Sequence, residues 1–126
     1  MAELKSSNPY DHLLVRTEDP ENIKIQLAQV KTHEIFEEDN CRVRVFTANP
    51  KPHRFYVGCE ICIPDIDVKV YSPVTDCAKI GFATTEQNAM LFMLGRIVAI
   101  YGDKINEHIA HFLKQAIFNH RQRSLF

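Results

Sequence analysis

The cysteine pair in Cys59-Glu60-Ile61-Cys62 is the one motif of this 126-residue sequence whose spacing is typical of metal or redox chemistry. Together with Cys41 and Cys77, the pair could supply four thiolates to a structural zinc ion. However, the pair lies inside an alternating apolar run, where residues three apart point to opposite faces of a strand. No helix start accompanies it, as a thioredoxin-like site would require. We therefore interpret Cys59 as a core residue and Cys62 as a surface residue.

Two histidines form a second constellation that could bind a metal. His108 and His111 are one helical turn apart, so both imidazoles could reach one ion. Their neighbours Glu107 and Lys114 are typical of a solvated helix face, and no pattern indicates a third ligand. The solvated face is the preferred interpretation, and the sequence indicates no cofactor.

A third set of side chains could bind single-stranded nucleic acid. Bases stack on aromatic rings and phosphates are attracted by basic side chains, and both kinds interleave on the outward face of an expected sheet. An ordinary charge ladder explains the same pattern, because the expected register places Glu60 between basic neighbours and sets two aromatic residues opposite each other. The set comprises Arg42, Arg44, Phe46, Arg54, Tyr56, Lys69 and Tyr71.

No motif indicates catalysis. The sequence has no glycine-rich phosphate loop and no nucleophile elbow, and a net charge of −1 lacks the excess expected of a dedicated nucleic-acid binder. Apolar Phe118 lies off the main stripe of its helix, and Leu125-Phe126 follows it. The leading hypothesis is therefore a non-catalytic interaction module that binds another protein or itself. Nucleic-acid binding is the alternative, a metalloprotein or small enzyme ranks third, and no small-molecule ligand is indicated.

Composition and the first residues indicate a cytosolic protein of one domain. Residues 1–126 are enough for one hydrophobic core. The N-terminus lacks the charged and apolar regions of a signal peptide, so the cytosol and free thiols are expected. The longest apolar run is short and is interrupted by Arg96, which excludes a membrane span there.

The elements that must position these residues begin with a sheet. A period of two predicts an antiparallel meander with strands at about 41–48, 53–63, 66–72 and 78–83. A tight turn at Pro64-Asp65 would set Ile63 opposite Ile66, and a loop centred on Lys51 would set Val45 opposite Val57. The same registers place Cys59 between Val43 and Val70, Glu60 between Arg42 and Lys69, and Phe46 opposite Tyr56. Both registers place the apolar side chains on one face of the sheet.

Two helices are predicted at about 85–101 and 104–119. The first is apolar all round, so it should be buried, with Thr84 and Gln87 forming a capping box. Gly102 should follow its end and Asp103 should cap the second helix. Small residues at Asn88, Gly95 and Ala99 should let a neighbouring element approach closely. The second helix has one apolar stripe, made by Ile105, Ile109, Phe112, Leu113, Ala116 and Ile117.

The N-terminal part gives the weakest pattern. Residues 1–18 are expected to be mostly irregular, docking through Leu13-Leu14-Val15, and residues 120–126 are expected to fray. Residues 20–32 fit either a helix, which would begin at Asp19-Pro20, or a strand; their helix formers favour a helix ending near Thr32. A sheet, a buried helix and an outer helix together predict a layered α+β domain.

Overall fold

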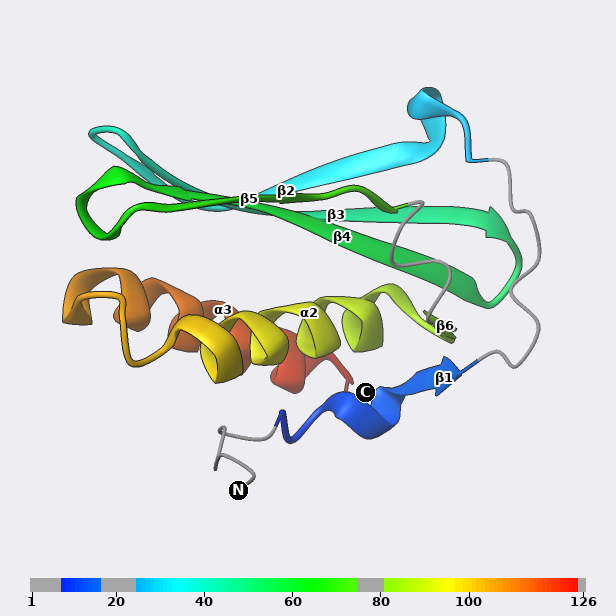
Figure 1. Ribbon diagram of the computed structural model, residues 1–126. Helices are drawn as coiled ribbons and strands as arrows, with labels where there is room; N and C mark the ends of the chain where they lie inside the picture. Colours follow the sequence, from blue (N-terminus) through cyan, green and yellow to red (C-terminus); the bar gives the residue numbers. More distant parts are fainter. Residues whose placement is uncertain (1–7, 17–24, 75–80, 125–126) are drawn as a thin grey trace, which may run out of the picture.

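An antiparallel sheet lies over two helices in the computed structural model, which describes residues 8–16, 25–74 and 81–124 (Figure 1). The predicted α+β arrangement with a C-terminal helical hairpin is therefore confirmed. The strands are β1 (Leu14–Arg16), β2 (Val30–Glu38), β3 (Cys41–Lys51), β4 (Arg54–Ile63), β5 (Val68–Ser72) and β6 (Gly81–Ala83), and the helices are α2 (Glu86–Tyr101) and α3 (Glu107–Ser124).

The strands follow the order β1-β6-β4-β3-β2, and β5 also pairs with β4. Strand β4 is central: β3 pairs along it on one side, while β5 pairs with Cys59–Ile63 and β6 meets it at Phe55. The three predicted meander strands are confirmed as β3, β4 and β5. The fourth, predicted at 78–83, is confirmed as β6 over Gly81–Ala83; the rest of that range lies outside the described residues.

The register of the first hairpin differs from the predicted one by two residues. Val45 lies opposite Cys59 and Thr47 opposite Val57, so the predicted Val45–Val57 pair is wrong. The reason is the position of the turn, which is made by Pro52-His53, with His53 at a φ of 61°. The strand register also shifts between Ala48 and Lys51, so the residues between them do not continue the regular pairing.

The second hairpin is also displaced by two residues. Ile63 lies opposite Val68, not Ile66, because the connection is a single 3₁₀ turn over Pro64–Ile66 followed by Asp67 in the left-handed region. Side chains alternate with a period of two, so a displacement of two keeps every residue on its predicted face. The predicted core face is therefore confirmed, although the individual cross-strand pairs were not.

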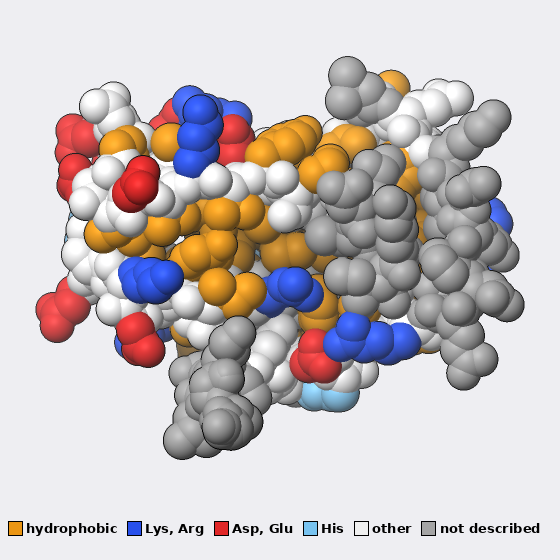
Figure 2. Space-filling model, in the orientation of Figure 1, with side chains coloured by type: hydrophobic (Ala, Val, Ile, Leu, Met, Phe, Trp, Pro, Cys, Tyr) orange, Lys and Arg blue, Asp and Glu red, His pale blue; other side chains and the backbone are white. Residues whose placement is uncertain are grey.

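The core lies between that face of the sheet and α2. Eight α2 residues are buried, which confirms that this helix is covered from several directions. Its N-cap is Thr85, whose hydroxyl accepts from the Asn88 N–H at 3.1 Å; the predicted capping box at Thr84 is wrong by one residue. Hydrophobic side chains nevertheless still show on the face where the sheet lies above α2 (Figure 2).

The N-terminal segment covers α2 on a side away from the sheet. The Asn8 amide donates to the Phe92 carbonyl at 3.0 Å, and a Cβ at Gly95 would lie 2.2 Å from Asn8 Oδ1. The close approach predicted at the small-residue seam is thus confirmed at Gly95. The segment is more regular than predicted, because it forms a 3₁₀ turn and then β1, whose Leu14 is buried as expected of a docking residue.

Strand β2 corrects the helix favoured for residues 20–32. Residues 17–24, including the predicted start at Asp19-Pro20, lie outside the described residues; Leu27–Gln29 form one 3₁₀ turn and β2 begins at Val30. From Val30 onward, strand pairing overrides the local helix propensity. Strand β2 pairs with β3 from Val30 opposite Ala48 to Glu38 opposite Cys41.

Helix α3 begins and ends later than predicted. Asn106, not Asp103, caps it: its Oδ1 accepts from the Ile109 N–H at 2.8 Å. The chain turns instead at Tyr101, whose carbonyl accepts from the N–H groups of Lys104 and Ile105. The helix continues to Ser124, so the frayed tail predicted from residue 120 is wrong over the described residues.

Candidate functional site

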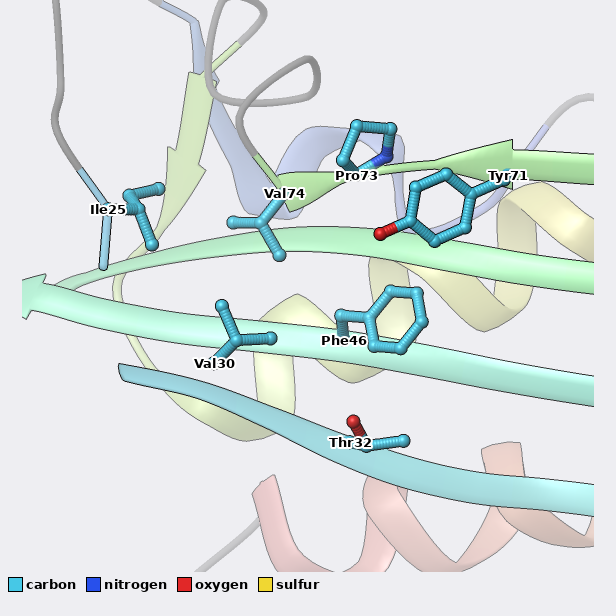
Figure 3. A pocket seen from close by; sticks show the side chains of 7 residues that line it. All are labelled: Ile25, Val30, Thr32, Phe46, Tyr71, Pro73 and Val74. Carbon is cyan, nitrogen blue, oxygen red and sulfur yellow. The ribbon is translucent and has the colours of Figure 1, made fainter. Parts of the chain in front are cut away.

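The candidate site is a groove on the sheet face opposite the helices, called here the outer-face groove (Figure 3). It encloses about 450 Å³, which is in the size range of small-ligand and peptide-anchoring pockets. None of its described lining residues is charged. They are Ile25, Val30, Thr32, Phe46, Tyr71, Pro73 and Val74.

Strand register explains why apolar residues gather there. Thr32 lies opposite Phe46, and Phe46 lies opposite Gly58, so one cross-strand row has an aromatic ring beside a residue with no side chain. Instead of facing Tyr56 as predicted, the Phe46 ring meets the Tyr71 ring edge-to-face, with centroids 6.0 Å apart. Tyr71 is 66% exposed, so this aromatic pair forms an open wall of the groove.

Gly58 also allows the chain to extend this wall beyond Tyr71 (Figure 3). After β5 the backbone crosses close to β4, and a Cβ at Gly58 would lie 2.4 Å from the Ser72 carbonyl oxygen and 2.8 Å from the Val74 nitrogen. Any larger residue at 58 would push this crossing segment away. Pro73 and Val74 are thereby held beside the aromatic pair.

The floor beside the groove is a small second core made by Ala48, Tyr56 and Val74. Tyr56, predicted to be an exposed stacking platform, is fully buried, and its ring meets Phe82 at 6.1 Å. Its hydroxyl has no hydrogen-bond partner among the described atoms. Tyr56 therefore supports the groove and offers no ring to solvent.

A row of charges lies beside the groove. Arg44 Nε contacts Glu34 Oε2 at 2.7 Å, and Arg44 Nη1 contacts Glu60 Oε1 at 3.4 Å. The hydrogen bond that Arg44 donates to the Glu34 carboxylate raises the pKa of Arg44 above its ordinary value. Glu60 lies between Arg44 and Tyr71 in the sheet, not between Arg42 and Lys69 as predicted, because of the two-residue displacement.

The other basic residues of the predicted nucleic-acid face lie on the outer face but are dispersed. Arg42 pairs with Glu37 at 3.4 Å, and the Arg54 guanidinium lies 4.7 Å from the centre of the Phe82 ring. Lys69 is exposed and lies opposite Cys62, which in turn lies opposite Arg42 on the next strand. The structure thus brings Phe46 and Tyr71 together and surrounds the arginines with carboxylates or a ring.

The cysteine pair lies within β4, as predicted. Cys59 is 6% exposed on the helix side, between Val45 and Ser72, whereas Cys62 is half-buried on the outer face. The predicted neighbours Val43 and Val70 were wrong by the same two-residue displacement. Burial, assisted by Asp65 and Asp39, raises the pKa of the nearby Cys41 thiol, so its reactive thiolate is disfavoured.

The two histidines of α3 both pack edge-on against Phe112, and His108 has further contacts. His108 Nε2 lies 3.0 Å from Glu38 Oε1, and its ring packs edge-on against Phe36. Among the described residues, no three His, Cys, Asp or Glu side chains gather as a metal site.

His33 is a titratable residue that the sequence reasoning did not single out. Its Nε2 lies 2.9 Å from the Thr47 hydroxyl on the helix side of the sheet, where Thr47 is the one buried polar residue among those described. Burial lowers the pKa of His33, so the neutral imidazole is favoured. The pair satisfies the hydrogen bonding of a buried hydroxyl.

Sequence reasoning also missed most of the groove lining. Ile25 and Val30 lie in the range for which the sequence favours a helix, and Pro73 and Val74 follow the third predicted strand, where the sequence indicates no site. Apolar residues near Phe46 interrupt the charged pattern of the outward face, and this interruption is the one sign of a binding surface in the sequence. Whether these residues meet the rest of the groove lining depends on the path of the chain after β5.

Comparisons with known proteins give no relative: no family model, no curated protein and no solved structure matches this chain. Among the described residues, no helix is long and apolar enough to cross a membrane.

Proposed function

We propose that this protein is a non-catalytic interaction module that holds an apolar segment of a protein partner in the outer-face groove. The supporting observation is the open aromatic wall made by Phe46 and Tyr71 in a groove with an uncharged described lining. An exposed aromatic pair beside a concave apolar surface is typical of an anchoring site in protein recognition. The free thiols Cys41 and Cys62 suit the reducing cytosol, where we expect this binding to occur.

The groove is suited to binding and not to chemistry. Its described polar groups are the hydroxyls of Thr32 and Tyr71, and a general acid or base would need a group that titrates near neutral pH. A charged ligand would have to lose its water beside apolar side chains, which costs several kcal/mol without a counter-charge. The surface therefore favours an uncharged, apolar segment.

The test is capture of the partner by the purified protein from a native lysate, with light scattering to detect self-association. Tyr71→Glu places a charge in the wall of the groove, and because Tyr71 is 66% exposed the variant should fold. The matched control is Lys114→Glu on α3, because Lys114 is exposed and α3 lies on the other side of the sheet from the groove (Figure 1).

We expect the wild-type protein and Lys114→Glu to retain the same partner or the same oligomer. Tyr71→Glu should lose at least about tenfold in affinity, or about 1.4 kcal/mol. A strict monomer that retains no partner at micromolar concentration would overturn the proposal. Equal retention by Tyr71→Glu would remove the outer-face groove as the site.

A further inference from the structure

A second groove lies on the helix side of the sheet, between the outer edge of β5 and helix α2, and is called here the β5–α2 groove. In Figure 2 hydrophobic side chains form a band across this face, between the sheet above and α2 below. The groove encloses about 150 Å³ and is lined by Cys59, Ile61, Val70, Ser72, Met93, Arg96, Ile97, Ile100 and Tyr101.

Among the described residues, one edge of strand β5 has no strand partner. Within the described residues it pairs with β4 alone, so the backbone groups on its other side have no strand partner. An edge of this kind accepts an added strand, and the new strand gains main-chain hydrogen bonds whatever its sequence.

The side chains below this edge form a receptacle for one anchor. Met93, Ile97 and Ile100 recur at steps of four and three residues, so they lie on one face of α2. Ile100 is 50% exposed although it lies beside the core. A space of about 150 Å³ is below the range of drug-sized ligand sites, and it suits a single apolar side chain.

Arg96 gives the groove a charge. It interrupts the apolar run of α2, it is exposed, and it makes no ion pair or hydrogen bond within the described residues. A guanidinium that has no carboxylate partner in the described part of the chain, at the border of an apolar groove, favours a carboxylate on whatever binds there.

The edge of the sheet formed by β2 is less suitable. Strand β2 is interrupted by an irregularity between Glu34 and Phe36, and its exposed carboxylates Glu34, Glu37 and Glu38 already have basic partners. Bulges and charges of this kind protect an edge against strand addition. The outer-face groove, in turn, has no cation in its described lining.

We propose that the β5–α2 groove binds an extended segment of a partner protein by strand addition to β5. The segment inserts one apolar side chain between Val70 and Ile97 and presents an Asp or Glu side chain to Arg96. This goes beyond the proposed function, because Tyr71 and Val70 point to opposite faces of β5 and the two grooves therefore bind different surfaces.

The experiment is selection from a phage library of short random peptides, fused so that their C-termini are not free, against the folded protein. Enriched peptides should alternate apolar and polar residues and carry an Asp or Glu at a fixed distance from one large apolar residue. A selected peptide, synthesised with an amidated C-terminus, should bind in solution, and replacing its acidic residue by Gln or Asn should weaken binding about tenfold.

Protein variants locate the site. Arg96→Glu should weaken binding of the acidic peptide about tenfold and improve binding of the same peptide with Lys in place of the acidic residue. Ile100→Glu should weaken both. Lys114→Glu on α3 is the matched charge control, and Tyr71→Glu, which disables the outer-face groove, should also leave peptide binding unchanged. Amide resonances of Val68–Ser72 should shift when the peptide is added.

If the wild-type protein enriches peptides no better than Ile100→Glu does, this proposal is overturned. That result would leave the proposal for the outer-face groove in place. Peptides whose binding is lost with Tyr71→Glu and not with Arg96→Glu would overturn it in favour of the outer face. Binding that depends on a free peptide C-terminus and not on an acidic side chain would overturn the assigned partner of Arg96.

Discussion

At the scale of single residues, one strand gives two cysteines opposite environments. Cys59 is packed between Val45 and Ser72 under the sheet, and Cys62 lies between Arg42 and Lys69 on the outer face. The three-residue spacing that suggested metal or redox chemistry is the spacing that separates them, because a strand alternates its faces. The cysteines can therefore be tested separately.

We expect a thiol reagent to modify Cys62 much faster than Cys59 in the native protein, as followed by mass spectrometry of the peptides. Cys59→Ser should destabilise by roughly 1–3 kcal/mol, because it puts a hydroxyl in an apolar position, whereas Cys62→Ser should stay within about 0.5 kcal/mol. A shared disulfide or metal would instead protect both together, and equal labelling rates would contradict the strand assignment of Arg54–Ile63.

At the scale of elements, α2 is stabilised by the segment that docks against Gly95. Asn8 donates to the Phe92 carbonyl and accepts from the Tyr10 N–H, each at 3.0 Å. The absence of a Cβ at Gly95 is what admits this side chain. Asn8, from the N-terminal segment, therefore fills the space that the small residues of α2 leave.

Gly95→Ala should destabilise the protein by about 1 kcal/mol in urea unfolding. Helix propensity alone would favour alanine by about 1 kcal/mol, but the new Cβ displaces Asn8 and costs two hydrogen bonds worth about 1 kcal/mol each, as well as the packing of Tyr10. In an Asn8→Gly background the same change should cost less, because only the contact with Tyr10 then remains. Equal effects in both backgrounds would show that Asn8 and Gly95 are not coupled.

At the scale of the whole molecule, the charge distribution argues against nucleic acid. The net charge is −1, and the outer face holds Arg44 between Glu34 and Glu60 and pairs Arg42 with Glu37. Phosphate binding draws its free energy from unpaired cations that release counterions, and these two cations are already compensated.

We therefore expect no mobility shift of a single-stranded oligonucleotide at low salt and micromolar protein. The comparison is with the same protein at higher salt and with Tyr71→Ala and Arg42→Ala. A salt-sensitive shift that both substitutions weaken would support the nucleic-acid alternative and contradict the preference for an apolar protein segment.

The sequence by itself determined which side of each strand faces the core and that α2 is buried. Both depend on local periodicity: side chains alternate every residue in a strand, and α2 is apolar on all sides, so these properties survive errors in the turns. That is why a two-residue displacement in both hairpins left the predicted core face correct, and why the opposite burial of Cys59 and Cys62 could be predicted.

Tertiary structure alone decided the path of the chain and the sites that depend on it. Residues 30–32 carry no strong strand pattern and become a strand because β3 offers them a partner, and Tyr56 is buried because Val74 and Phe82 converge on it from distant parts of the sequence. Both grooves are made by such convergence: the outer-face groove by the crossing over Gly58, and the β5–α2 groove by an edge strand lying beside Arg96. Contacts between residues so far apart leave no period in the sequence, so only the folded chain reveals them.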